Sequence, residues 1–197
     1  KPGTHIQMDG QVGLAYNHIV CEGTQDSMIT FTKNINDYQL WSGVTSFRDE
    51  AIFKYTIFEY GWPRTSQQLV GPGNRISFED CIFRYNEHYY GNTYTGNHLT
   101  LQGSQYAVRC LFEYNKAQSH IIGLEDDNWT GHFNDNIISG NLTENGIEPL
   151  ACVSIRTIND LSRIKGNSFL RHRQQLWAVP NHNPSGFPIG IRWSNGG

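Results

Sequence analysis

Apolar residues in this chain alternate with polar ones over short stretches, as in residues 99–101, 153–155 and 189–191. Glycine, asparagine and aspartate separate these stretches, which is typical of β-strands joined by tight turns. No long stretch places its apolar positions about 3.6 residues apart, the spacing of an amphipathic helix. The pattern therefore predicts an all-β protein built from many short strands.

A six-residue phrase occurs twice with little change, as CIFRYN in Cys81–Asn86 and as CLFEYN in Cys110–Asn115. More divergent copies begin at Thr56, Asn136 and Asn167, so that successive copies start between 25 and 31 residues apart. A period in this range is typical of stacked supersecondary units, and about 25 residues make roughly three short strands and three turns. This is one coil of a parallel β-helix, so the period predicts a β-solenoid of about seven coils.

Aligning the copies of the phrase places similar residues in common columns. One apolar column lies three residues before the phrase, at Phe53, Phe78, Ala107, Phe133 and Ile164. A second, mostly apolar column is the second position of the phrase, at Ile57, Ile82, Leu111, Ile137 and Ser168. Coils of a β-helix stack about 4.8 Å apart, so each column is expected to form a ladder along one axis.

The last position of the phrase forms a further column, at Gly61, Asn86, Asn115, Asn141 and His172. Glycine and asparagine tolerate left-handed backbone geometry, so this column is expected at a turn. Stacked asparagine amides can also hydrogen-bond from one coil to the next. A turn with an asparagine ladder is therefore expected along one edge of the solenoid.

The order Ile-x-Phe-x-x-Cys-x-Phe-x-x-Asn in residues 76–86 resembles the general repeat of the right-handed parallel β-helix superfamily, the pectin-lyase-like fold. Residues 2–8, 18–24, 27–32 and 41–44 are similar to the opening of bacterial secreted and surface β-helix proteins. The resemblance implies an all-β, single-stranded right-handed parallel β-helix, with residues 1–197 forming one domain. This superfamily contains lyases, hydrolases, epimerases, phage tailspikes and adhesins, so the resemblance leaves the function open.

The net charge of −3 argues against nucleic acids and anionic membrane surfaces as main partners. Charged residues make up 17% of the chain and aromatic residues 13%, which fits a β-solenoid in contact with neutral polar ligands. No stretch approaches the length of apolar sequence that a membrane span needs. The chain shows no signal peptide and does not begin with methionine, so we interpret it as a mature or excised chain of a secreted or cell-surface protein.

Neither end of the chain carries an obvious cap. Lys1–Thr4 begins without a polar covering segment, and Ile191–Gly197 ends without one. Because uncovered solenoid ends can pair with other chains, we expect a capping partner, end-to-end assembly, or a longer parent protein.

Cys81 and Cys110 share the first position of the phrase and should stack on adjacent coils. At that spacing they can form a disulfide, or they can pack as two small apolar side chains. The sequence leaves both alternatives open. The chain has no Cys-x-x-Cys pair, so a structural zinc site is not expected.

An acidic cluster, Glu125, Asp126 and Asp127, directly follows a predicted strand. Its carboxylates could hold Ca²⁺ or act as acid and base, although a solvated turn is the simpler interpretation. With His120 and Arg156, these residues are the candidates for a catalytic groove. No cofactor other than Ca²⁺ is indicated.

Aromatic side chains recur in the predicted loops, at Trp62, Tyr89, Tyr90, Tyr94 and Trp129. Exposed aromatic faces stack on sugar rings and contact proteins, but such loops can equally fold back over the solenoid. The leading hypothesis is a non-catalytic extracellular or cell-surface module that binds a polysaccharide or a surface protein through these loops. The alternatives are a polysaccharide lyase or glycoside hydrolase acting on a groove of the solenoid, and a structural segment of a fibre or surface assembly.

Overall fold

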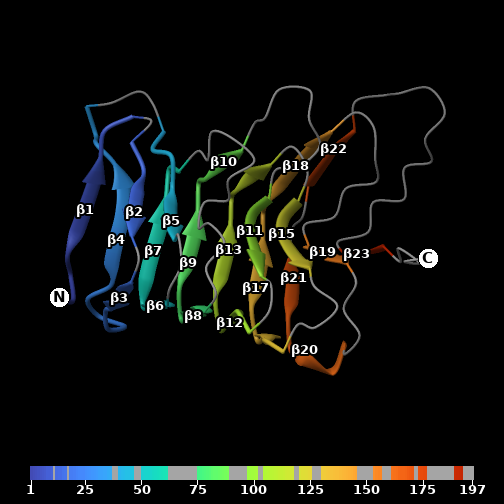
Figure 1. The fold of residues 1–197 in the computed structure, drawn as a ribbon. Coiled ribbons are helices and arrows are strands. Elements are labelled where there is room, and N and C mark those ends of the chain that lie inside the picture. The colour runs from blue at the N-terminus through green and yellow to red at the C-terminus, as the bar shows by residue number, and fades with distance from the viewer. Residues whose placement is uncertain are drawn as a thin grey trace.

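Parallel β-sheets make up nearly all of the described structure (Figure 1). The computed structural model describes residues 1–10, 12–16, 18–36, 40–46, 50–61, 75–88, 97–101, 104–117, 120–125, 130–145, 153–156, 161–170, 173–176 and 189–192. Within these ranges every strand pairs with its neighbour in parallel, as β4 (Ile29–Lys33) does with β7 (Thr56–Glu59) and β6 (Glu50–Lys54) does with β8 (Arg75–Glu79). The predicted all-β parallel β-helix is therefore confirmed.

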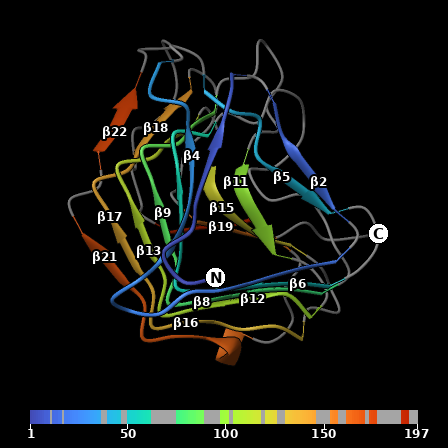
Figure 2. The same ribbon diagram turned by 90° about the vertical axis from the view of Figure 1, so that its left-hand side faces the viewer.

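Two extended sheets carry most of the strands. The first, which we call the long sheet, consists in spatial order of β1 (His5–Met8), β4 (Ile29–Lys33), β7 (Thr56–Glu59), β9 (Ile82–Arg84), β13 (Leu111–Glu113), β17 (Ile137–Ser139) and β21 (Ser168–Leu170). The second, which we call the six-stranded sheet, consists of β3 (Ile19–Glu22), β6 (Glu50–Lys54), β8 (Arg75–Glu79), β12 (Tyr106–Val108), β16 (Phe133–Asn134) and β20 (Ile164–Lys165). Figure 2 looks along the solenoid and shows these sheets on different sides of one core.

Smaller sheets complete the coils. One contains β10 (Glu87–His88), β14 (Lys116–Ala117), β18 (Leu142–Asn145) and β22 (Arg173–Leu176). Another contains β11 (Asn97–Leu101), β15 (His120–Glu125), β19 (Val153–Arg156) and β23 (Ile189–Arg192). The first coils add a pair, β2 (Leu14–Tyr16) and β5 (Val44–Ser46), and a single 3₁₀ turn, Leu161–Arg163, precedes β20 in the described part of the chain.

The number of coils differs from the expected seven. Strand order follows chain order in every sheet, so each coil adds one strand to each sheet that it enters. The sheets containing β10 and β11 have four strands each, which gives about four complete turns among the described residues. The period therefore predicts the repeat correctly, but it overestimates how many turns contain all of the strands.

The core is built from phenylalanine stacks that run along the solenoid. In one stack the ring centroids of Phe58 and Phe83 are 5.0 Å apart, and those of Phe83 and Phe112 are 4.8 Å apart. In the other stack Phe53 and Phe78 are 5.3 Å apart, and Phe78 meets Phe83 edge to face. The column predicted three residues before the phrase is thus a core ladder, because in-register pairing repeats the inward position on every coil.

The predicted asparagine ladder is present and fully buried. Asn86 Nδ2 donates to Asn115 Oδ1 at 3.0 Å, and Asn115 Nδ2 donates to Asn141 Oδ1 at 2.9 Å. A second, unpredicted ladder joins Asn136 Nδ2 to Asn167 Oδ1 at 2.9 Å. Each amide also donates to a carbonyl of the preceding coil, as Asn115 does to Phe83 at 2.9 Å. Side-chain hydrogen bonds therefore join each turn to the coils on either side of it.

The left-handed backbone lies one residue earlier than the sequence predicts. Positive φ angles occur at Tyr60, Tyr85 and Tyr114, each directly before the Gly or Asn column. A second corner, between the six-stranded and long sheets, has positive φ at Tyr55, Asp80, Arg109 and Asp135. Such residues cost roughly 1 kcal/mol or more each, and the sharp turn they make directs the following side chain into the core.

Cys81 and Cys110 are buried thiols with no bond between them in this structure. Cys81 Sγ lies 3.3 Å from the carbonyl oxygens of Phe53 and Glu79. Thr56 occupies the same column one coil earlier and donates to the equivalent Lys54 carbonyl at 3.2 Å. The column therefore accepts small side chains that can donate to a carbonyl two residues earlier.

A Cys81→Thr variant should differ from the wild type in its dependence on alkaline pH. Burial, and next the hydrogen bond with Cys110, raise the pKa of the Cys81 thiol well above its ordinary value of 9.0. The unfolded chain therefore loses this proton first, and wild-type stability should fall as pH rises above about 9. Urea unfolding across this range should show a shallower decline in Cys81→Thr, which keeps the column but cannot titrate. Parallel declines would contradict a buried neutral thiol.

Candidate functional site

Most of the site residues predicted from sequence lie outside the described residues. These are all five loop aromatics and two of the acidic cluster: Trp62, Tyr89, Tyr90, Tyr94, Trp129, Asp126 and Asp127. The aromatic-loop site and the Ca²⁺ site therefore stay predictions. In the part of the chain that the structure describes, no three His, Cys, Asp or Glu side chains are grouped as metal ligands would be.

The candidate catalytic residues of β15 and β19 are only partly brought together. Glu125 pairs in register with Arg156, and Arg156 pairs in turn with Arg192 of β23. His120 begins β15 and pairs with Asn97 instead, at the other end of the strand from Glu125. Five residues of strand separate them by about 16 Å, so the structure does not place His120 in one groove with Glu125.

A row of aliphatic side chains runs along the outer face of the long sheet. Register aligns its members on four consecutive strands, and we call them the aliphatic stripe: Ile57, Ile82, Leu111 and Ile137. Their strand neighbours Phe83 and Phe112 are 1% exposed and fill the core. Because successive residues of a strand point to opposite faces, the stripe faces outward, and Ile137 is 42% exposed. The second apolar column of the sequence is therefore a surface feature.

A charged row lies two residues further along the same strands. Glu59, Arg84, Glu113 and Ser139 occupy matching positions in it. Arg84 Nη2 and Nε both lie 2.8 Å from Glu59 Oε2, so this cation is paired within the sheet. No described cation pairs with Glu113, which leaves its carboxylate as a hydrogen-bond acceptor beside the stripe.

Stacked tyrosine rings stand at the corner directly beyond the charged row. We call Tyr60, Tyr85 and Tyr114 the tyrosine ladder; successive ring centroids are 5.5 and 5.7 Å apart. Lys33 Nζ covers the Tyr60 ring at 5.3 Å, and the Tyr114 ring lies so close to Gly140 that a Cβ there would be 2.8 Å from its Cε1. Stacking covers the sides of the rings that face one another, and Tyr85 and Tyr114 remain 40% and 51% exposed.

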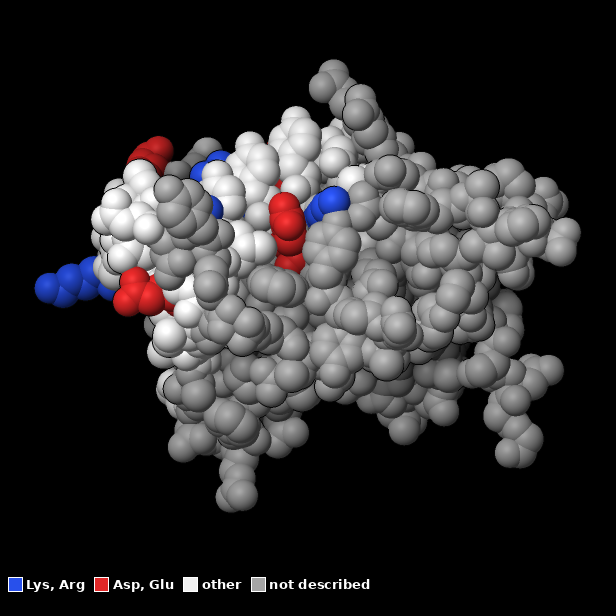
Figure 3. Space-filling view, turned by 90° about the horizontal axis from the view of Figure 1, so that it is seen from above, with Lys and Arg blue, Asp and Glu red and all other residues white. Residues whose placement is uncertain are grey.

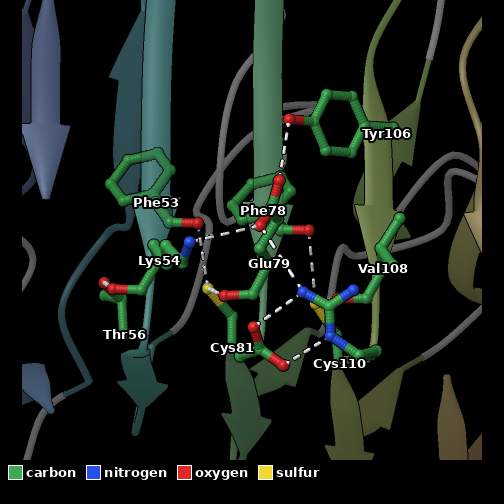
Figure 4. Close-up of polar contacts among 11 residues, drawn as sticks. Phe53, Lys54, Thr56, Phe78, Glu79, Cys81, Tyr106, Val108 and Cys110 are labelled. Atoms are coloured by element: carbon green, nitrogen blue, oxygen red, sulfur yellow. Dashed lines mark hydrogen bonds and ion pairs between the residues drawn. The ribbon is translucent and has the colours of Figure 1, made fainter. Parts of the chain in front are cut away.

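The opposite corner of the long sheet carries a group of polar contacts, and Figure 4 shows those of Glu79 with Tyr106 and Lys54. In the same group, Arg109 Nε and Nη2 each lie 2.8 Å from an oxygen of Asp80, a bidentate pair. The Asp80 carboxylate raises the pKa of Arg109 above its ordinary value, so the guanidinium stays charged. The Glu79 carboxylate accepts a hydrogen bond from Tyr106 Oη at 3.2 Å and forms an ion pair with Lys54 Nζ at 3.6 Å (Figure 4).

A shallow hollow of about 220 Å³ lies on the six-stranded sheet. Both polar and apolar side chains line it: Glu50, Ile52, Ile76, Ser77, Ser104 and Tyr106. Register pairs Ile52 with Ser77 and Ser77 with Tyr106, so the lining follows three successive coils. The hydrogen bond to Glu79 fixes the tyrosine at one side of the hollow.

Charges of both signs are interspersed over the described surface. In the view from above, acidic and basic side chains occur singly or beside one of opposite sign, without a patch of one sign (Figure 3). Among the described residues, four ion pairs join cations and carboxylates of neighbouring coils. Among the described residues seen from this side, the cations are therefore not gathered into one patch.

Comparison with known proteins adds little to the geometry. No family model matches the chain, and no curated protein matches it either. One similar solved structure is an alginate lyase from Paenibacillus sp. str. FPU-7, with 9% sequence identity and a TM-score of 0.28 over 97% of this chain and 85% of that one. At this score the likeness carries no argument about the fold or activity of the chain.

The tyrosine ladder lies outside the site residues predicted from the sequence, because that prediction placed the binding aromatics in loops. Its signal is nevertheless present, because Tyr60, Tyr85 and Tyr114 recur at the fifth position of the phrase. A residue that recurs at one position of a repeat becomes a ladder when the coils stack in register. In the described structure the aliphatic stripe, the charged row and the ladder form one continuous surface, and we take it as the candidate site.

Proposed function

We propose that this chain is a non-catalytic module of a secreted or cell-surface protein that binds carbohydrate through the outer face of its long sheet. The observation that carries the proposal is the aliphatic stripe between two polar corners. A sugar ring has an apolar face edged by hydroxyl groups, and this surface offers an apolar floor edged by hydrogen-bonding groups. We also propose that the fold belongs to the pectin-lyase-like superfamily of right-handed β-helices, on the repeat in residues 76–86.

The long sheet favours carbohydrate over a protein partner because its outward groups are narrow and mixed in character. A single aliphatic row has no bulky anchor, whereas protein interfaces concentrate their energy in buried aromatic and arginine residues. On this face Arg84 is already paired with Glu59, and the tyrosine rings stack on one another along the ladder. Such groups suit many weak hydrogen bonds to hydroxyls.

The proposal is tested by screening the purified chain against immobilised glycans, with turnover of neutral polysaccharides and polyuronates followed in parallel. The wild type should bind at least one glycan without degrading it. Tyr85→Ala should weaken this binding about tenfold, because it removes the middle ring and hydroxyl of the ladder. Tyr106→Ala, on the six-stranded sheet, is the matched control and should bind as the wild type does.

The same screen distinguishes the loop prediction from the sheet. If Tyr89→Ala and Trp129→Ala abolish binding while Tyr85→Ala does not, the binding site is the aromatic loops. Turnover of any polysaccharide would overturn the non-catalytic proposal. Binding of a protein instead of a glycan would show that the outer face of the long sheet is a protein-binding surface.

A polysaccharide lyase is the second candidate, favoured by the row that joins Glu125, Arg156 and Arg192 across three strands. Arginines in such a row could neutralise a uronate carboxylate, the first requirement for removing the adjacent proton. Polyuronate incubated with the chain should then gain the ultraviolet absorbance of an unsaturated product. Arg156→Gln should lose that activity, and an inactive wild type excludes the candidate for the substrates tried.

A further inference from the structure

We infer that the ligand of the long sheet is an extended, neutral, β-linked polysaccharide that lies along the solenoid axis with about one sugar residue per coil. The inference rests on the proposed function and names its substrate class. It follows from three properties of the surface: its repeat distance, its dimensions and its closed ion pairs.

The repeat of the surface matches an extended glycan. Ile57, Ile82 and Leu111 are aligned on adjacent parallel strands, so equivalent atoms recur about every 4.8 Å. The tyrosine ladder repeats in the same direction, with centroids 5.5 and 5.7 Å apart. An extended β-1,4-linked chain advances by a similar length per sugar. Successive rings are turned by about half a revolution, so a ring face recurs at every sugar and a given hydroxyl edge at every second sugar. Each coil would therefore meet one ring face through its aliphatic side chain.

The dimensions of the face favour a linear ligand over a second folded protein. Seven strands extend over about 30 Å, and four residues of strand between the corners span about 13 Å. The resulting area is roughly 400 Å², about half of what each partner buries in a typical stable interface. A peptide would gain no main-chain hydrogen bonds here, because the sheet offers its face and not an open strand edge. A single glycan chain needs only the width of the stripe.

The ion pairs at both corners favour a neutral sugar over a uronate. Arg84 is held by Glu59 and Arg109 by both oxygens of Asp80, so neither guanidinium faces the stripe unpaired. Glu113 adds a carboxylate that has no described partner, which would repel a polyuronate. The same carboxylate accepts hydrogen bonds from a sugar diol without such a penalty. Lys33, the cation over the Tyr60 ring, lies at one end of the tyrosine ladder, so along the middle of the stripe charge selects against polyanions while keeping the hydrogen bonds.

Calorimetric titration with β-1,4-linked gluco-oligosaccharides, from the disaccharide to the hexasaccharide, tests the inference. Affinity should rise with each sugar up to about the tetrasaccharide, because the stripe extends over four strands, and should then level off. Oligogalacturonates of the same lengths should bind at least tenfold more weakly.

Leu111→Thr is the informative variant, because threonine keeps the strand preference and removes the apolar contact. It should weaken tetrasaccharide binding about tenfold and leave disaccharide binding at the opposite end of the stripe less affected. Val20→Thr is the matched control, since Val20 is 47% exposed on the outer face of the six-stranded sheet. It should bind as the wild type does.

Each result decides a different statement. A glycan bound with no dependence on length, or equally well by Leu111→Thr, would overturn the axial arrangement and leave the carbohydrate-binding function standing. Preference for oligogalacturonates would overturn the neutral substrate class. Failure to bind any glycan in the wider screen would remove the proposed function itself, and the inference with it.

Discussion

A Phe83→Ala variant should lose about 3 to 5 kcal/mol of unfolding free energy. Phe83 lies in the middle of one core stack, with Phe58 at 5.0 Å and Phe112 at 4.8 Å between ring centroids. It also meets Phe78 of the other stack edge to face at 5.2 Å. Truncation removes the contacts of Phe83 with three other rings. Neighbouring coils cannot close the cavity, because their backbone pairing holds them in place.

Urea unfolding followed by tryptophan fluorescence measures this loss. Phe83→Leu keeps most of the volume and should lose clearly less than Phe83→Ala, which separates cavity formation from loss of the aromatic contact. Leu170→Ala is the control, because Leu170 is 50% exposed on the same sheet and should change stability by about 0.5 kcal/mol or less. Equal losses at Phe83 and Leu170 would contradict a shared core.

The repeat explains why the fold could be predicted from the sequence. A parallel in-register stack converts each recurring residue into a ladder, so columns of Phe and Asn in the sequence are columns in space. The alternation did not reveal which apolar column faces inward. Phe58 and Ile57 are neighbours in β7 and are both apolar, and only burial shows that the phenylalanine belongs to the core.

The candidate site was less accessible to sequence reasoning for a physical reason. The neighbours of an outward residue in a solenoid are set by the register between coils, which the sequence spacing alone does not give. Glu125 and Arg156 are 31 positions apart in the chain, yet register pairs them directly. His120 is closer to Glu125 in sequence, yet the two residues lie at opposite ends of β15. An extended strand holds residues five positions apart far from each other, whereas a turn would bring them together.

The position of the tight turns shows the same limit. Asparagine was expected to adopt the left-handed conformation, for which it has a real preference. The structure uses tyrosine at φ 54° in Tyr85 and keeps Asn86 for the buried amide ladder. The backbone strain at the tyrosine is offset by the hydrogen bonds that the following asparagine makes. The preference of asparagine for the left-handed conformation is thus overridden, because Asn86 is needed for the buried ladder and the turn is made by Tyr85 instead.

Asn115→Ala should cost about 3 to 5 kcal/mol, because it breaks the ladder in the middle. Asn115 Nδ2 donates to Phe83 O and to Asn141 Oδ1, both at 2.9 Å. Its Oδ1 accepts from the backbone N of Asn86 at 3.2 Å and from Asn86 Nδ2 at 3.0 Å. Truncation leaves a buried backbone donor of Asn86 without its acceptor, and the asparagine side chain is 1% exposed, so water does not replace it.

Asn134→Ala is the matched control for the ladder. Asn134 Oδ1 accepts one hydrogen bond, from Lys165 N at 3.0 Å, in an exposed part of the six-stranded sheet. Water can take the place of this acceptor, so the loss should be about 1 kcal/mol or less. Similar losses for the two asparagines would show that the buried amides act as ordinary surface hydrogen bonds.

Asn115→Asp isolates the donor half of the amide and gives a dependence on pH. The new carboxylate would face the acceptors Phe83 O and Asn141 Oδ1, so the folded state should favour its protonated form and raise its pKa. A raised pKa means that stability is highest below the ordinary aspartate value of about 3.9 and is lost as pH rises through the value in the fold. Unfolding at neutral and mildly acidic pH should therefore show Asn115→Asp recovering part of its deficit relative to wild type at the lower pH, while Asn115→Ala keeps a constant deficit. An aspartate variant whose deficit does not shrink on acidification would mean that the two donor contacts of Asn115 contribute little, and that the ladder is held by its acceptor side alone.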